Sequence, residues 1–129
     1  AYNYIKPDQG SYLNGALLTP YAAKTSSGEL FAQPFFTSTQ DLGSGNALML
    51  SLEGNLTDQL IAGARYSFMD LKESENVASR NQSEYMLFGI YNFTGALKGF
   101  SVSNFAGIQT SPRYDKKFLQ NRFALSYKF

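Results

Sequence analysis

The side chains best suited to chemistry are two arginines, Arg65 and Arg122, which stand among polar residues at alternate positions. A guanidinium is always charged and can hold a carboxylate through two parallel hydrogen bonds. The polar residues that share this pattern are Ser51, Glu53, Ser67, Glu84 and Gln120. The sequence leaves two interpretations open: the arginines bind anions, or they are solvated or paired with the glutamates and have no selective role.

The chain lacks the residues on which most protein catalysis and metal binding depend. It has no His and no Cys among its 129 residues. This composition excludes Ser-His nucleophile pairs, thiol chemistry, disulfides and histidine metal sites. The formal net charge is only +1, so no general attraction to nucleic acid is expected. We therefore expect no enzyme activity, no cofactor, no metal and no nucleic-acid partner.

The final stretch of the chain, FLQNRFALSYKF, shows best how these polar groups are positioned. From Asn121 onward its odd positions are mostly apolar, ending on Tyr127 and Phe129, whereas its even positions include Arg122 and Lys128. This period of two predicts a β-strand with two unlike faces. In water a terminal aromatic row invites aggregation. In a bilayer it becomes a lipid-facing surface, with the polar row turned toward water inside a barrel. An ordinary strand buried on one face is the alternative.

Six further strands are predicted upstream of the closing one. They span residues 16–24, 29–39, 46–54, 60–70, 84–93 and 100–110, after an N-terminal stub at 1–6 that forms the tail of a strand. Pro20 and Pro34 interrupt the first two strands, because proline cannot donate to the ladder. Alternation in the other strands assigns all seven candidate polar residues to one face.

The connections between these strands sort into two groups that differ in length. Residues 25–28, 55–58 and 94–99 form one group, and residues 40–45, 71–83 and 111–117 form the other. If the C-terminus is periplasmic, the first group is periplasmic and the second is external. The second group is longer, which matches the short periplasmic turns and longer outer loops of outer-membrane barrels.

The composition also favours membrane strands over membrane helices. Apolar runs are only a few residues long, far short of the roughly 20 that a membrane helix needs. Charged residues make up 16% of the chain, below the usual roughly 25%. Nine Tyr and eleven Phe suit strands with aromatic girdles at two membrane interfaces. The predicted interface aromatics are Tyr85, Tyr91, Phe93, Phe100, Tyr127 and Phe129.

Five short segments together resemble the C-terminal third of OprD-type outer-membrane porins, particularly those of Campylobacter-like bacteria. They are Leu17–Tyr21, Phe36–Gln40, Gly63–Tyr66, Gly95–Phe100 and Tyr127–Phe129. The Leu-Lys-Gly turn before a strand is the most telling of these segments. The resemblance covers most of the chain. It implies an all-β fold, an antiparallel up-and-down transmembrane β-barrel of about sixteen to eighteen strands, of which this chain holds the C-terminal strands.

The resemblance also implies a function and a location. A porin of this type forms a water-filled channel in the bacterial outer membrane for passive diffusion of small hydrophilic solutes. Basic side chains along the wall guide carboxylate-bearing solutes, a role that Arg65 and Arg122 can fill, and the seven polar residues become pore-lining candidates. The implied partners are outer-membrane lipids, lipopolysaccharide, these solutes and the barrel-assembly machinery, which binds the closing strand. A homotrimer is compatible with this family.

Length is the departure from this family, because seven strands and a stub cannot close a porin-sized barrel. We expect residues 1–129 to be a single barrel segment that belongs to a longer chain. Two other structures remain open. One is a complete eight-stranded barrel with a structural or adhesive role, acting through residues 71–83 without a wide pore. The other is a soluble all-β sandwich. A barrel hydrolase is disfavoured, because such enzymes resemble Ser-His designs and the chain has no His.

Overall fold

A computed structural model of the chain describes residues 2–8, 10, 44–72, 80–111 and 114–129. The elements in these ranges are β1 (Tyr2–Ile5), β2 (Gly45–Asn55), β3 (Leu60–Leu71), β4 (Arg80–Asn92), the 3₁₀ helix η2 (Gly95–Leu97), β5 (Phe100–Ser111) and β6 (Tyr114–Tyr127). Within this part of the chain, no helix is long and apolar enough to cross a membrane. The predicted strands at 16–24 and 29–39 lie outside the described residues.

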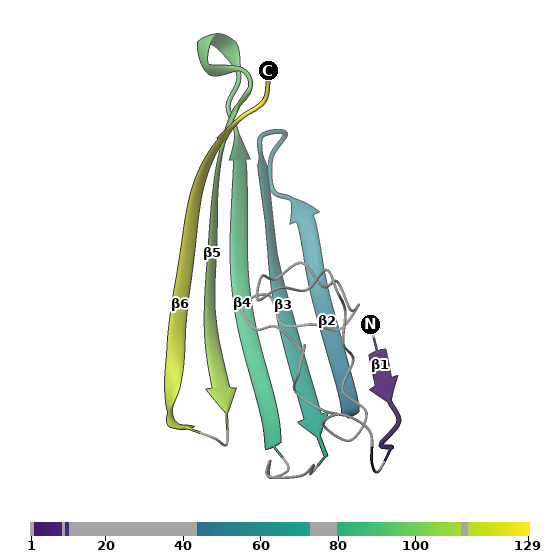
Figure 1. Ribbon diagram of the computed structural model, residues 1–129. Helices are drawn as coiled ribbons and strands as arrows, with labels where there is room; N and C mark the ends of the chain where they lie inside the picture. The colour runs from purple at the N-terminus through teal and green to yellow at the C-terminus, as the bar shows by residue number, and fades with distance from the viewer. Residues whose placement is uncertain (1, 9, 11–43, 73–79, 112–113) are drawn as a thin grey trace.

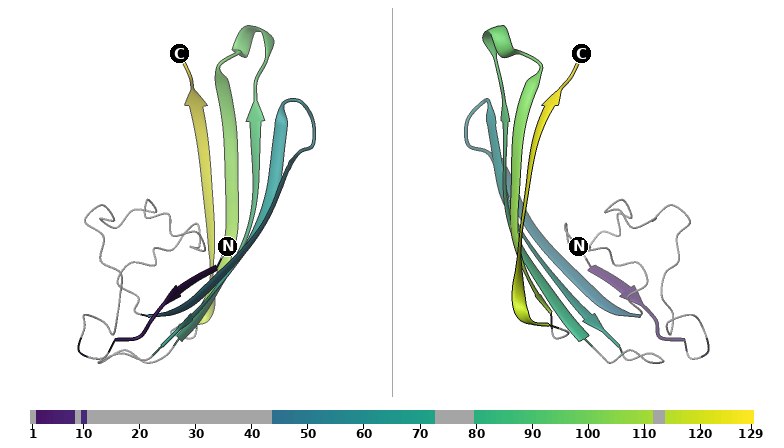
Figure 2. Two further views of the ribbon diagram at one scale, coloured as in Figure 1. Left: turned by 90° about the vertical axis from the view of Figure 1, so that its right-hand side faces the viewer. Right: turned by 60° about the vertical axis from the view of Figure 1, so that its left-hand side comes forward.

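The described strands form one antiparallel sheet in the order β1-β2-β3-β4-β5-β6. Strands β2 to β5 each pair with the next strand along the chain, which ends at β6. This confirms the predicted all-β, up-and-down arrangement for these five strands. The sheet is open, with the short β1 at one edge and β6 at the other (Figure 1). It also twists and curves along the strand direction (Figure 2).

The register of the strands separates the side chains into two faces. Leu52 lies opposite Ala64, and Ala64 lies opposite Leu87, so these three residues share one face of the sheet. The adjacent pair, Ser51 opposite Arg65, lies on the other face, because successive side chains of a strand point to opposite faces. We call the face with Leu52, Ala64 and Leu87 the apolar face, and the face with Ser51 and Arg65 the polar face.

Two turns close hairpins at the same end of the sheet as the C-terminus (Figure 1). In the β2–β3 turn, the backbone N–H of Leu56 donates to the carbonyl oxygen of Leu60 at 2.8 Å, and Thr57 Oγ1 accepts from the N–H of Leu60 at 3.0 Å. The β4–β5 connection contains η2 and ends at Gly99, whose φ of +98° favours glycine. This placement confirms the prediction that these two turns and the C-terminus share one side.

Two predicted loops are shorter in the structure. The sequence predicts a loop at 71–83, but Leu71 still pairs with Arg80 as the last rung between β3 and β4. Similarly, β6 begins at Tyr114, inside the predicted loop 111–117. In both places the strands continue into segments that are polar on both faces, so the backbone ladder persists after the alternation has ended.

The neighbour of the N-terminal strand also differs from the prediction. Residues 1–6 are predicted to be the tail of a strand, and the structure forms strand β1 at Tyr2–Ile5 in this stretch. However, β1 pairs directly with β2, with Tyr2 opposite Leu48. A series of consecutive hairpins instead predicts that residues 1–6 pair with the strand at 16–24 and that the strand at 46–54 pairs with the one at 29–39. Because local alternation identifies a strand but carries no information on its partner, the sequence could not reveal this pairing.

Burial is concentrated on the polar face. The buried hydrophobic side chains among the described residues are Met69, Leu71 and Met86, and the buried polar ones include Ser67 and Glu84. By register all five point to the polar face. The apolar face, in contrast, is largely exposed. This distribution is the reverse of that in a soluble protein, where the apolar side of a sheet forms the core.

Candidate functional site on the polar face

The polar face brings all seven predicted site residues to one side of the sheet. Ser51 and Glu53 come from β2, and Arg65 and Ser67 from β3. The remaining three residues are Glu84 on β4 and Gln120 and Arg122 on β6. The register of the four strand pairs places all seven side chains on this face, so their position follows directly from the period of two.

The most buried part of this face is a polar row that crosses β3, β4 and β5. Ser67 lies opposite Glu84, which lies opposite Gln109. Gln109 Nε2 donates a hydrogen bond to Glu84 Oε2 at 2.8 Å, and all three side chains are buried. The hydroxyl of Ser67 has no partner among the described residues. A buried hydroxyl without a hydrogen bond is costly, and Ser67 is wholly buried at this point of the sheet.

Arg65 lies two positions before Ser67 on β3 and so points to the same face as this row. It lies between Ser51 and Met86 in the register. No described residue forms an ion pair with it, and its Nε is buried without a hydrogen-bond partner. Its guanidinium therefore has binding capacity for an anion.

The two arginines lie too far apart to act on the same small anion. Arg122 lies opposite Phe105 on β6, while Arg65 is on β3. With β4 and β5 between them and an offset of two residues along the strands, the two positions are separated by about 16 Å, at about 4.8 Å for each strand step and about 3.3 Å per residue. The structure therefore brings both arginines to one wall without forming a shared pocket. They can contact an anion one after the other but cannot clamp it together.

Two aromatic residues on the polar face were missed by sequence reasoning. Phe88 and Phe105 lie opposite each other on β4 and β5, and their rings stack with centroids 5.5 Å apart and an interplanar angle of 19°. The Phe88 ring covers Gly63 on β3, so closely that a Cβ atom added there would lie 2.6 Å from Phe88 Cε1. The available signal was the break in alternation at Phe88 and Phe105, paired with a glycine at Gly63.

The apolar face exposes large side chains over most of the sheet. Leu52 is 78% exposed, Leu87 67% and Leu119 77%. These residues come from β2, β4 and β6, so the exposed apolar surface runs across the sheet. Water-exposed apolar patches of this extent are rare on soluble monomers.

The predicted interface aromatics gather at the two ends of this apolar face. Five of them lie at the end with the C-terminus: Tyr91, Phe93, Phe100, Tyr127 and Phe129. Their rings contact in pairs, with centroid distances of 5.0 Å for Tyr91–Phe93, 4.5 Å for Phe100–Tyr127 and 5.1 Å for Tyr127–Phe129.

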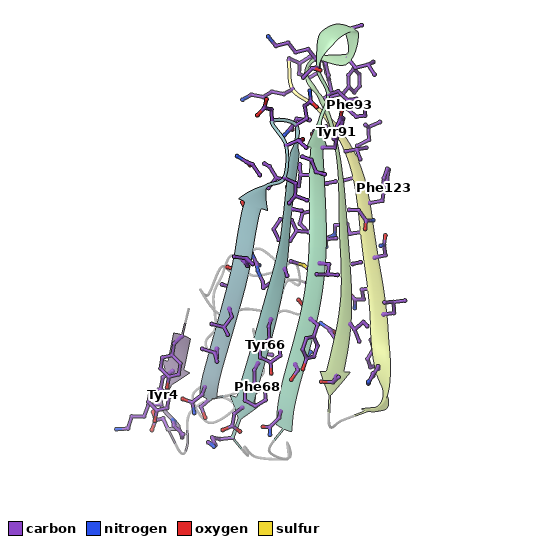
Figure 3. All side chains as sticks on the ribbon, turned by 180° about the vertical axis from the view of Figure 1, so that it is seen from behind. Tyr4, Tyr66, Phe68, Tyr91, Phe93 and Phe123 are labelled. Atoms are coloured by element: carbon purple, nitrogen blue, oxygen red, sulfur yellow. The ribbon has the colours of Figure 1, made fainter. Side chains whose placement is uncertain are left out.

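The sixth predicted aromatic, Tyr85, lies toward the opposite end of the sheet. Its ring contacts Tyr66 at 4.8 Å, and Phe68 lies further along β3 in the same direction. Figure 3 shows the two groups, with Tyr91 and Phe93 at one end and Tyr66, Phe68 and Tyr4 toward the other. Sequence analysis did not assign these last three to an interface, although Tyr66 and Phe68 lie on the face that it predicts to be apolar.

The described residues offer no cluster of three His, Cys, Asp or Glu side chains that could hold a metal ion. Comparisons with protein families, with curated proteins and with solved structures find no match to this chain. The functional assignment therefore rests on the two faces of the sheet.

Proposed function

We propose that this chain is the C-terminal part of a porin of the bacterial outer membrane, which forms a water-filled channel for small hydrophilic solutes. The apolar face contacts membrane lipid and lipopolysaccharide, and the polar face lines the channel. Strands β2 to β6 contain 11 to 14 residues each, which is enough for the roughly 9–11 residues that a tilted strand needs to cross a bilayer. The closing strand β6 is the segment offered to the barrel-assembly machinery.

The observation that carries this proposal is the exposed apolar face bounded by two groups of aromatic rings. Phe100 on β5 marks one boundary, and Phe68 on β3 marks the other. Because Phe68 lies opposite Ser83, and Ser83 lies opposite Thr110, the second boundary reaches β5 at Thr110. Along β5, the length from Phe100 to Thr110 is about 33 Å at about 3.3 Å per residue. For strands tilted by about 40°, this length spans about 25 Å along a barrel axis, the usual height of the apolar band in outer-membrane barrels.

The polar face supports a preference for carboxylate-bearing solutes. The Nε of Arg65 has no hydrogen-bond partner among the described residues, and Arg122 lies on the same face. Because each guanidinium can hold a carboxylate through two hydrogen bonds, the pair offers an anion two successive contacts. Ser51 lies opposite Arg65, and Gln120 precedes Arg122 on the same face of β6. Between the two arginines, the polar face carries Met86, Gly107 and the stacked rings of Phe88 and Phe105.

The proposal is tested by conductance across planar bilayers after insertion of the full-length protein extracted from membranes. We expect stable conductance steps that rise in proportion to salt concentration, with organic carboxylates passing more readily than organic cations of similar size. Insertion without conductance would favour a small closed barrel that acts as a structural or adhesive protein. A protein that stays soluble without detergent would exclude the membrane assignment.

A matched pair of substitutions tests which face meets lipid. Leu52 and Glu53 are neighbours on β2, both are exposed, and they point to opposite faces. Lysine on the lipid face near the middle of a bilayer costs about 2–4 kcal/mol, so Leu52→Lys should reduce the folded fraction in membranes while Glu53→Lys should not. In a soluble protein both substitutions would be tolerated, because neither side chain is buried. Equal tolerance would therefore contradict the proposal.

A further inference from the structure

The polar face carries two opposite charges, Glu53 and Arg65, that lie close together without pairing. Glu53 on β2 is directly opposite Gly63 on β3, and Arg65 follows Gly63 by two positions on the same face. At about 4.8 Å for the strand step and about 3.3 Å per residue, the Cα atoms of Glu53 and Arg65 are about 8 Å apart. Long side chains can meet across such a diagonal, yet no ion pair joins these two. Within the described part of the chain, both charges thus remain available to a third group.

An aromatic ring borders both of these charges. The ring of Phe88 on β4 reaches across to β3 and covers Gly63, where an added Cβ atom would lie 2.6 Å from Phe88 Cε1. The ring stacks on Phe105 with centroids 5.5 Å apart, and both phenylalanines are only half-buried. The interior wall of a water-filled barrel is polar, so hydration alone gives no reason for two partly exposed rings there. They add an apolar patch directly beside Glu53 and Arg65.

We propose that Glu53, Arg65 and Phe88 form a binding site for aromatic α-amino acids on the channel wall. Arg65 holds the carboxylate of the solute through two parallel hydrogen bonds, and Glu53 accepts hydrogen bonds from its ammonium group. The ring of the solute packs against Phe88 in the offset or edge-to-face geometry that aromatic pairs prefer. This inference rests on the proposed function, in which the polar face lines the channel, and it names the class of solute that the wall selects.

The combination of three groups separates this class of solute from simpler ones. A solute with a carboxylate but no ammonium group brings a second negative charge close to Glu53, and like charges repel. A solute with an ammonium group but no carboxylate brings a positive charge close to Arg65, with the same penalty. An aliphatic amino acid satisfies both charges but leaves the ring of Phe88 without a partner. A zwitterion with an aromatic side chain satisfies all three groups at once.

Block of the ion current provides the test, because a solute held at the wall reduces the current that small ions carry. The full-length protein extracted from membranes is inserted into planar bilayers in potassium chloride. Phenylalanine is then compared with alanine, hydrocinnamate and phenethylamine, which lack the ring, the ammonium group and the carboxylate, respectively. We expect phenylalanine to block at a concentration about tenfold lower than any of these three, because each of them loses one contact to a ring or to a charged group.

Glu53→Gln tests the carboxylate of the wall directly. Glu53 is exposed, so we expect the variant to fold and conduct. The substitution should raise the phenylalanine concentration needed for block about tenfold, because the ammonium group loses a charged partner, and it should not weaken block by hydrocinnamate. Asp58→Asn is the matched control: it makes the same change of charge at an exposed residue in the β2–β3 turn, outside the strands, and should leave block by phenylalanine unchanged.

The outcomes separate this inference from the proposed function. Equal block by phenylalanine and hydrocinnamate, or equal effects of Glu53→Gln and Asp58→Asn, would overturn the inference. A protein that conducts but shows no preference among the four solutes would overturn the inference and leave the proposed function standing. A protein that inserts without conducting would overturn the proposed function and the inference with it.

Discussion

Gln109 on β5 donates a hydrogen bond of 2.8 Å to Glu84 on β4, and both side chains are buried on the polar face of the sheet. The two residues are 25 positions apart in the chain, so this bond links neighbouring strands at a point where the register sets them directly opposite each other. A hydrogen bond to a buried carboxylate contributes more than one to a neutral group. The pair therefore links β4 and β5 at the part of the polar face that has the most buried polar groups.

Gln109→Leu should lower the free energy of unfolding by about 1–3 kcal/mol, because the buried Glu84 carboxylate loses this donor. The measurement is the midpoint of guanidinium unfolding of the protein in detergent micelles. Gln120→Leu is the control, since Gln120 lies on the same face one strand away and is less buried than Gln109. A similar small loss in both variants would mean that the bond between Gln109 and Glu84 adds little to stability.

Gly63→Ala should destabilise the sheet by about 1–3 kcal/mol, because an added methyl group overpacks a filled site. Its Cβ would lie 2.6 Å from Phe88 Cε1 and 2.7 Å from the carbonyl oxygen of Leu52. The ring can move only by leaving its stack with Phe105. Gly54→Ala is the control, because a Cβ there meets nothing within 4 Å. Equal unfolding midpoints for the two variants would show that the Phe88 ring is free to shift.

Gly99→Ala should be more harmful than Gly95→Ala, although both glycines have positive φ angles of +98° and +64°. Both substitutions carry the backbone strain of a left-handed residue. At Gly99 the new Cβ would also lie 2.8 Å from Tyr127 Cε2, whereas at Gly95 it would meet nothing within 4 Å. We expect an additional loss of about 1 kcal/mol or more for Gly99→Ala, read from thermal unfolding. Equal losses would mean that Tyr127 yields to the methyl group at little cost.

The alternation of residue types predicted much of this fold, because a sheet with two unlike faces shows its period of two in the sequence. Strand β6 is the clearest example, with Phe123 and Tyr127 on one face and Arg122 on the other. The same pattern assigned all seven polar site residues to one wall. It failed where both faces are polar, as at Arg80, where β4 begins inside a predicted loop.

Contacts between strands could not be predicted, because they depend on register and not on local pattern. The bond between Asn104 and Asn121 joins residues that are diagonal neighbours across the β5–β6 pair. The stacked rings of Phe88 and Phe105 likewise become partners only when β4 and β5 are aligned. In each strand taken alone, these residues only interrupt an otherwise regular alternation.

Arg65→Gln should reduce the preference of the channel for organic anions, because it replaces a guanidinium that has no ion-pair partner among the described residues with a neutral amide. Arg122→Gln should reduce it as well, and the double variant should lose about the sum of the two effects. Sites about 16 Å apart act nearly independently. The measurement is the reversal potential in a gradient of an organic carboxylate salt, across bilayers that hold the full-length protein.

Glu53→Gln removes a negative charge from the same face and should shift the reversal potential in the opposite direction. If neither arginine variant changes the selectivity, the arginines are merely solvated groups of the wall.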